Sequence, residues 1–324
     1  MTTKPLKVLF FSHDSKLGDA IVNTAFVAGL KQHDPHCEIH ATVAGVTATF
    51  WAQDERISKT WTVQKPGWRD TVRLGRAFRR EHYDYIVTWQ RMRKEKNRLM
   101  LWLAKPGAVI DLHAFNQGVI THKIEACGEA LAQMNRRGAA ELAYDVKLEA
   151  RCEQIDALLA PAGEVFVVNL FAADAERNIG HAQAVGIVRG LQAMAPAAVV
   201  CLVCTDVTEV QAQSVQAACA PSAQVVNCDG NLARLFRLCE RADMVISPDT
   251  ALVHIASAFD TPVIGIYQDN GVKAVQWGPR SKAHGIVLSS NPLTLEGFAV
   301  GRVLELAAGL RVGTRAHPTA IEHS

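Results

Sequence analysis

Short apolar runs alternate with segments of helical periodicity along both halves of the chain, and this alternation is the feature that most restricts its fold. Residues 7–11 and 38–43 have strand patterns, and residues 19–30 between them place apolar side chains on one helical face. Continuous apolar strands are typical of parallel sheets that are buried on both faces. Because right-handed crossovers link such strands, we expect an α/β protein with two doubly wound, Rossmann-like domains facing across a cleft.

The pattern loosens after residue 138, and the Pro-Ala-Gly sequence at 161–163 has turn chemistry. We therefore place the domain boundary near Leu159, with domains at 1–159 and 160–324. The first domain is expected to continue with strands at 83–89 and 108–111 and a helix at 122–134. The second is expected to have strands at 165–170, 198–204, 224–227, 242–246 and 261–267, and helices at 181–194, 209–218, 232–241 and 250–259.

Composition indicates an ordinary globular chain, because 49% of the 324 residues are hydrophobic and 20% are charged. No apolar run reaches the roughly 18 residues of a membrane helix, and the N-terminus enters a strand instead of a signal-peptide core. We expect a cytoplasmic protein.

The 8 cysteines are scattered along the chain. The spacing of Cys201 and Cys204 sends their side chains to opposite faces of a strand. We therefore expect buried thiols and no metal site.

Positive charge is concentrated in one part of the first half. Residues 69–105 contain 11 Lys and Arg against 4 Asp and Glu, although the formal net charge of the chain is only +2. Such a surface attracts an acidic partner, including an anionic membrane, whereas a solvated helix face is the plainer interpretation of any single residue there. The aromatic residues in this stretch show no regular stacking pattern, so we expect no nucleic acid partner.

Residues 247–258, with the sequence Ser-Pro-Asp-Thr-Ala-Leu-Val-His-Ile-Ala-Ser-Ala, place hydroxyls and a histidine where a predicted strand meets a helix. Asp249 or Thr250 is a good N-cap for that helix. First-turn N–H groups lack intrahelical partners and the helix dipole favours negative charge, so a phosphate can be bound there. Thr250, His254 and Ser257 share one helical face beside this site. The alternative is an ordinary capped helix with a structural histidine.

A second polar loop, residues 12–19, joins the first strand to the first helix. Gly18 permits a tight turn, and Asp19 either caps the helix or faces the cleft as a base for an incoming hydroxyl. His13 and Asp14 are competing bases. The glycine-rich fingerprints of dinucleotide-binding and P-loop proteins are absent from the sequence, and so is the nucleophile elbow of hydrolases. We therefore expect no nicotinamide and no other bound cofactor.

Three motifs in the same order along the chain resemble the lipopolysaccharide heptosyltransferase family, glycosyltransferase family 9. They are Leu-Gly-Asp at 17–19, Asn-Leu-Phe-Ala at 169–172, and residues 247–256, where the family pattern is close to S-x-D-T-G-x-x-H-x-A. The resemblance implies the GT-B fold and inverting transfer of heptose from ADP-heptose to a lipopolysaccharide inner-core acceptor. It also implies work at the membrane surface, with peripheral attachment to the inner membrane as an option.

The resemblance implies a role for each matching residue. Asp19 matches the catalytic aspartate, which takes the proton of the acceptor hydroxyl, and Gly18 lies beside it. Arg177 stands where the family usually has lysine and would stabilise the departing diphosphate together with Thr250, without a metal ion. The segment around Asp249 would contact the diphosphate and the donor sugar. The remaining candidate substrate-binding residues are Ala251, Leu252, His254 and, for the nucleoside end, Thr205 and Asp206.

Two departures from the family pattern leave the donor sugar open. Ala251 replaces a glycine, which adds a methyl group near the ligand, and residues 174–179 differ from the usual serine- or threonine-rich sequence. The alternatives are a non-catalytic nucleotide-sugar-binding protein with the same fold, a transferase of different specificity and a sugar-nucleotide epimerase. The acceptor, the linkage position and the oligomeric state do not follow from the sequence.

Overall fold

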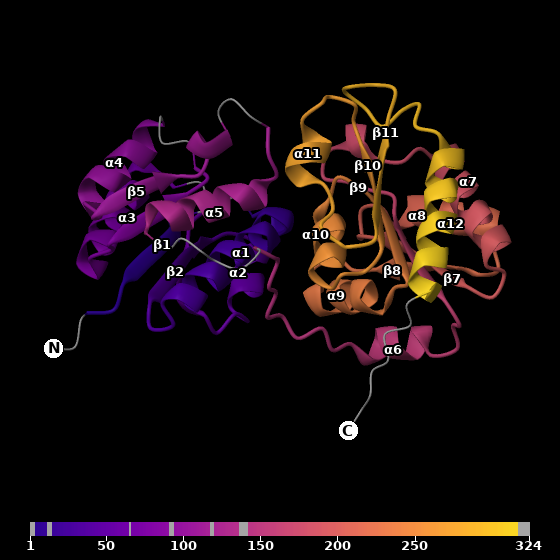
Figure 1. Ribbon diagram of the computed structural model, residues 1–324, viewed down its shortest axis with the longest axis horizontal. Coiled ribbons are helices and arrows are strands. Elements are labelled where there is room, and N and C mark those ends of the chain that lie inside the picture. The colour runs from indigo at the N-terminus through magenta and orange to yellow at the C-terminus, as the bar shows by residue number, and fades with distance from the viewer. Residues whose placement is uncertain are drawn as a thin grey trace. The chain divides into compact units, whose positions relative to one another are not determined.

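The computed structural model describes residues 4–11, 15–64, 66–90, 94–116, 120–135 and 142–316. The chain divides into two compact units, Met1–Leu148 and Glu149–Ser324, and each is built on a parallel sheet with helices between the strands (Figure 1). The predicted architecture of two doubly wound α/β domains is confirmed. The predicted boundary at Leu159 and the observed division differ because α6 (Glu153–Leu159) packs on α9 of the second unit, where Asp156 pairs with Arg237.

The first unit contains a five-stranded sheet in the order β3-β2-β1-β4-β5. On one face, α3 and α4 lie side by side over a core that includes Leu9, Phe78 and Ile86 (Figure 1). Helix α1 packs against α5. The elements are β1 (Lys7–Phe11), α1 (Leu17–His33), β2 (Glu38–Val43), α2 (Val46–Trp51), β3 (Ile57–Thr62), α3 (Trp68–Glu81), β4 (Tyr85–Thr88), α4 (Glu95–Ala104), β5 (Ala108–Asp111), η1 (Ala114–Asn116) and α5 (Lys123–Gln133).

The second unit contains a six-stranded sheet in the order β11-β10-β9-β6-β7-β8. Its core joins the central strands to α7 and α12 through fully buried residues such as Val168, Leu191 and Val303. After α6 the elements are β6 (Val165–Asn169), η2 (Ala175–Arg177), α7 (His181–Met194), β7 (Val199–Cys204), α8 (Glu209–Cys219), β8 (Ala223–Asn227), α9 (Leu232–Arg241), β9 (Met244–Pro248), α10 (Ala251–Ala258), β10 (Val263–Tyr267), α11 (Lys273–Trp277), β11 (His284–Leu288) and α12 (Val300–Ala316).

The strand predicted at 242–246 is found at 244–248, and its last residue is Pro248. On the β6 side the pairing of β9 ends at Ile246, whereas on the β10 side it continues until Pro248 lies opposite Ile266. The end of β9 therefore separates from β6 while it stays beside β10.

All eight cysteines are free thiols, and seven of them are buried. Cys201 and Cys204 lie in β7, where burial raises the pKa of Cys201 to about 12 and that of Cys204 to about 11. The prediction of buried thiols is thus confirmed for this pair. Among the helices in the described part of the chain, none combines the length and the apolar character needed to cross a bilayer.

Candidate active site

The strand order of the second unit reverses between β6 and β9, so the loops that follow these two strands diverge from a common edge. In doubly wound sheets, ligands bind beyond the carboxyl ends of the strands at such a reversal. The loop after β6 carries Arg177, and the turn after β9 carries Asp249 and Thr250. The topology therefore brings together three of the predicted site residues that lie far apart in the sequence.

Helix α10 begins with Thr250 as its N-cap. The Thr250 hydroxyl accepts a hydrogen bond from the Leu252 N–H at 3.3 Å, and the first turn of the helix contains no acidic residue. Thr250, one of the two predicted caps, is therefore the observed one. Because the first turn has no carboxylate, an anion from outside the helix can interact with the positive end of the helix dipole.

Asn169, the last residue of β6, fixes the hydroxyls around this helix start. Its side-chain amide donates to Ser247 Oγ and to Thr250 Oγ1, both at 3.1 Å, and the two hydroxyl oxygens are 2.9 Å apart. Ser247 Oγ is also 2.9 Å from the carbonyl oxygen of Pro248. If Ser247 donates to that carbonyl, then Thr250 donates to Ser247. If Ser247 instead donates to Thr250, the Thr250 proton is available for a ligand.

Arg177 lies against the same turn. Its Nη1 donates to the Asp249 carbonyl oxygen at 2.6 Å and approaches the Asp249 carboxylate at 3.3 Å, while its Nη2 donates to the Asp174 carboxylate at 2.8 Å. The side chains of Arg177 and Asp249 are 19% and 13% exposed, so they are largely buried, whereas Asp174 is exposed. The guanidinium is thus held at the start of α10, where the sequence predicted a cation beside phosphate.

The other predicted residues of α10 are used for packing. Ala251 is half-buried, Leu252 is buried, and His254 is only 3% exposed with its ring centre 5.9 Å from that of Trp277. Ser257 donates to the Val253 carbonyl and accepts from the Arg280 N–H. Of the polar face predicted for Thr250, His254 and Ser257, the last two are therefore covered by α11 and the segment that follows it, which agrees with a packing role for His254.

Thr205 and Asp206 form an exposed turn directly after β7. The Thr205 N–H donates to the Thr208 hydroxyl, and the Asp206 carboxylate accepts from the Asn227 amide at 2.8 Å. Both residues thus lie beyond a strand carboxyl end of the second sheet, as predicted.

In the first unit, α1 begins at Leu17 with Lys16 as N-cap. Gly18 and Asp19 therefore lie in the first helical turn, and Asp19 is not the cap residue itself. Both are half-buried. The competing bases His13 and Asp14 lie outside the described residues.

Sequence reasoning missed a polar cluster beyond β4 and β5 of the first unit. The Trp89 ring N–H donates to Asn23 of α1 at 2.8 Å, and the Lys123 ammonium lies 4.8 Å from the centre of the Trp89 ring. His113 contacts Trp89 edge-on and shares a short hydrogen bond with its carbonyl oxygen. Trp89 ends the strand predicted at 83–89 and His113 follows the one predicted at 108–111, which was the signal available. The 8% exposure of Lys123 could not be foreseen.

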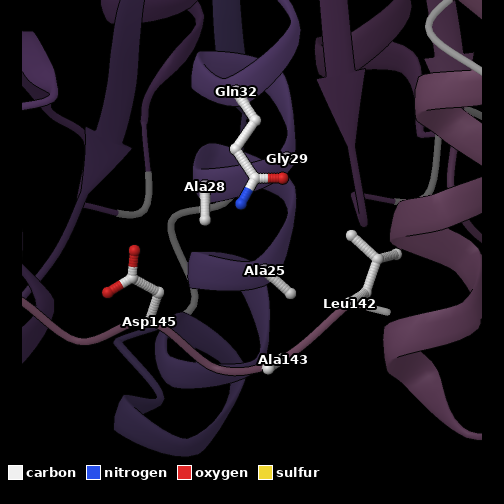
Figure 2. A pocket seen from close by; sticks show the side chains of 7 residues that line it. All are labelled: Ala25, Ala28, Gly29, Gln32, Leu142, Ala143 and Asp145. Carbon is white, nitrogen blue, oxygen red and sulfur yellow. The ribbon is translucent and has the colours of Figure 1, made fainter. Parts of the chain in front are cut away.

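A small pocket of about 180 Å³ lies elsewhere in the first unit, between α1 and the extended segment around Ala143 (Figure 2). Its wall is mostly small side chains, with Gln32 and Asp145 as the polar ones (Figure 2). Pockets for drug-sized ligands measure about 300–1,000 Å³. This pocket is smaller and contains none of the predicted site residues. Within the described ranges, no group of three or more His, Cys, Asp or Glu is arranged to hold a metal ion.

Comparison with known proteins gives a family match over part of the second unit and fold matches over almost the whole chain. The family model of glycosyltransferase family 9 (heptosyltransferase) matches residues 192–296, which include β7 to β11 and the start of α10. No curated sequence matches the chain.

Solved structures match over almost the whole chain. A family 9 glycosyl transferase from Veillonella parvula has a TM-score of 0.78 at 14% identity and covers 97% of this chain and 99% of its own. The E. coli ADP-heptose lps heptosyltransferase II has a TM-score of 0.74 at 14% identity, covering 96% and 100%. E. coli heptosyltransferase WaaC, solved with ADP, has a TM-score of 0.73 at 17% identity, covering 94% and 100%. The chain therefore shares the GT-B fold of these glycosyltransferases, and its second unit carries the sequence pattern of family 9.

Proposed function

We propose that the protein is an inverting glycosyltransferase that moves heptose from ADP-heptose to a lipopolysaccharide core acceptor, with Asp19 as general base and without a metal ion. The observation that carries the proposal is the position of the Arg177 guanidinium at the start of α10, 2.6 Å from the Asp249 carbonyl oxygen. A cation beside a helix N-terminus is a place for the diphosphate of a leaving nucleotide.

The donor is proposed from the same geometry and from the relatives. WaaC is solved with ADP and with ADP-2-deoxy-2-fluoro heptose. A guanidinium has five N–H donors, and the contacts with Asp249 and Asp174 use at most three, so phosphate oxygens can be bound without breaking them. The N–H groups of Leu252 and Val253 donate to the hydroxyl and the carbonyl oxygen of Thr250. We therefore assign the Ala251 N–H, the remaining amide at this helix start, to the diphosphate. Thr205 and Asp206 are assigned to the nucleoside end.

The Thr250 hydroxyl supplies a second contact in this scheme. Asn169 donates to both hydroxyl oxygens whichever way their protons point. When a phosphate oxygen accepts from Thr250, the Ser247 proton turns from the Pro248 carbonyl toward Thr250, so the hydrogen bond to Pro248 is exchanged for the one to the phosphate. His254 supports this helix start from within the packed unit and makes no direct contact with the ligand.

The reaction needs one base and one stabilised leaving group. Asp19 takes the proton from the acceptor hydroxyl, the acceptor oxygen forms a bond to the anomeric carbon, and the bond from that carbon to the diphosphate oxygen breaks on the opposite face, which inverts the configuration. Negative charge develops on the departing oxygen, where Arg177, the Ala251 N–H and Thr250 stabilise it. Gly18, without a side chain, leaves room for the acceptor next to Asp19. The acceptor is amphiphilic, so the enzyme works peripherally at the inner membrane.

The test is direct. Purified protein is incubated with ADP-heptose and a panel of truncated core acceptors, with EDTA present, while ADP release and acceptor mass are followed. We expect ADP release with a mass gain of one heptose that depends on the acceptor. Intact ADP binding without release for any acceptor contradicts the proposal and supports a nucleotide-sugar-binding protein. Conversion of the sugar nucleotide without an acceptor indicates an epimerase.

A further inference from the structure

We propose that the outer surface of α3 and α4 docks the protein onto an anionic lipid bilayer. We call this surface the α3–α4 face. It consists of exposed residues of both helices, namely Trp68, Arg69, Arg73, Arg76, Arg80, Arg98 and Trp102. The inference rests on the proposed function for its purpose, because an amphiphilic acceptor is held at a membrane. Its structural basis is independent of the reaction.

The spacing of four arginines makes α3 strongly one-sided. Arg69, Arg73, Arg76 and Arg80 are separated by four, three and four residues, which aligns them along a single helical stripe. The opposite stripe is buried in the core of the first unit and contains Leu74 and Phe78. All four arginines are exposed, and the acidic residue of the first turn, Asp70, pairs with Arg73.

Helix α4 extends the same surface. The two helices approach closely at Gly75, where an added Cβ would lie 2.7 Å from Leu103 Cβ. The buried side of α4 contains Asn97, Met100 and Ala104, so Arg98 and Trp102, four residues apart, lie on its outer side. Arginine side chains thus project from both helices of the α3–α4 face.

Two tryptophans favour a bilayer over other polyanions. Trp102 is 67% exposed and Trp68 is 52% exposed, and Lys96 places its ammonium 5.7 Å from the centre of the Trp68 ring. Large apolar rings beside basic side chains are typical of helices that lie in the headgroup region, where the ring enters the interface and the cations meet anionic lipids. A soluble polyanion without aromatic bases would use the arginines but would gain little from an apolar ring, whereas RNA, whose bases can stack on tryptophan, is compared directly in the test below.

Vesicle co-sedimentation tests the proposal, with vesicles of phosphatidylcholine alone and vesicles containing about one third phosphatidylglycerol. Each basic residue at an anionic surface changes partitioning about fivefold. We therefore expect binding to the anionic vesicles, and a loss of roughly 600-fold when Arg69, Arg73, Arg76 and Arg80 are all changed to Gln, because the four factors multiply. Trp102→Ala should weaken binding about tenfold at unchanged charge.

The matched control changes four exposed arginines of the second unit, Arg151, Arg241, Arg280 and Arg302, to Gln. It should bind vesicles like the wild type, and circular dichroism and ADP affinity should be unchanged in both quadruple variants. Equal losses in both variants, or no binding of the wild type to anionic vesicles, overturn the proposal. Vesicle binding that is insensitive to Trp102→Ala, together with equally tight binding of a 20-nucleotide RNA, also overturns it and indicates a general polyanion surface.

The proposed function is tested separately by wild-type transfer to a lipid-free core fragment. If that reaction fails while vesicle binding depends on the α3–α4 face, the function is wrong and the docking surface stands.

Discussion

Helices α1 and α10 both follow a central strand of a parallel sheet, but their first turns have opposite chemistry. Helix α1 has no side-chain cap and carries Asp19 in its first turn, whereas α10 is capped by the Thr250 hydroxyl and has no acidic residue there. A helix N-terminus favours nearby negative charge. In α1 the chain itself supplies that charge, and in α10 a ligand can supply it. The same strand-to-helix junction can therefore hold a basic carboxylate in the first unit and bind an anion in the second.

Removing the acidic group of α1 is the strongest way to break this comparison. Asp19→Asn should lower kcat by about 10²–10⁴-fold, because a positioned general base contributes that much, while the dissociation constant for ADP stays unchanged. Steady-state kinetics and calorimetry measure the two effects. Asp34→Asn, at the C-terminal end of α1, is the matched control and should keep full turnover. A loss of ADP affinity without a loss of kcat would place Asp19 in donor binding instead.

Acid should destabilise the first unit through His40. The Tyr83 hydroxyl accepts from Trp61 and shares a 2.7 Å hydrogen bond with Nδ1 of His40, whose imidazole is buried. Burial, and then the positive charge of Lys7, lower the pKa of His40 from 6.5 to about 4. Between these values the unfolded chain binds a proton that the folded chain does not, so stability falls as the pH decreases from about 6.5 to about 4.

The expected loss from this group is about 3 kcal/mol between pH 7 and pH 4. Urea unfolding at pH 7, 5.5 and 4 measures it against His40→Gln, which retains an acceptor and cannot titrate in this range. The variant should start less stable and lose less on acidification. Parallel pH profiles for the two proteins would show that His40 does not carry this dependence.

Changing the cation beside α10 tests the anion site. Arg177→Ala should weaken ADP binding roughly 10- to 150-fold, since hydrogen bonds to charged groups contribute about 1.5–3 kcal/mol. Arg177→Lys should recover part of the affinity, because lysine keeps the charge but not the planar fork. Arg189→Ala, at an exposed position on α7, is the control. An unchanged ADP affinity in Arg177→Ala would remove the arginine from the donor site.

The smallest expected effect concerns the cap itself. Thr250→Val should cost about 1 kcal/mol of stability and lower Tm by about 2–4 °C, because the Leu252 N–H loses its partner. Thr250→Ser keeps the oxygen and should remain close to the wild type. Calorimetric scanning compares both variants. Equal Tm values for valine and serine would mean that the cap does not stabilise α10.

Much of the fold could be predicted because its strands are continuous apolar runs. The helices predicted at 181–194 and 232–241 agree with α7 and α9 at both ends. The edge strands β3 and β11 were not predicted, because three or more of their residues are exposed and their sequences lack such a run. Helix α3 was not predicted as a helix. Its residues were noted only for their positive charge, because few of them are apolar and arginines separate those few.

The candidate site was predictable where a motif marks a strand end. Arg177, Asp249 and Thr250 were expected near phosphate, and in the structure Arg177 contacts Asp249, the residue directly before the cap Thr250. The burial of His254 was not predictable, because it depends on Trp277, which lies 23 residues further along the chain. The bonds from Asn169 to two hydroxyls were likewise not predictable, because they join the ends of β6 and β9, which are neighbours only in the folded sheet.

The carboxylates around Arg177 have a consequence for how quickly a nucleotide arrives. The guanidinium is accompanied by Asp174 and Asp249, so from more than a Debye length of about 8 Å this cluster has no net positive charge. An approaching diphosphate is therefore not drawn in from a distance, and the arginine recognises it at close range only. Because one cation and two carboxylates sum to −1, the association rate constant for ADP should not fall as the ionic strength rises, even though the bound complex is held by charge.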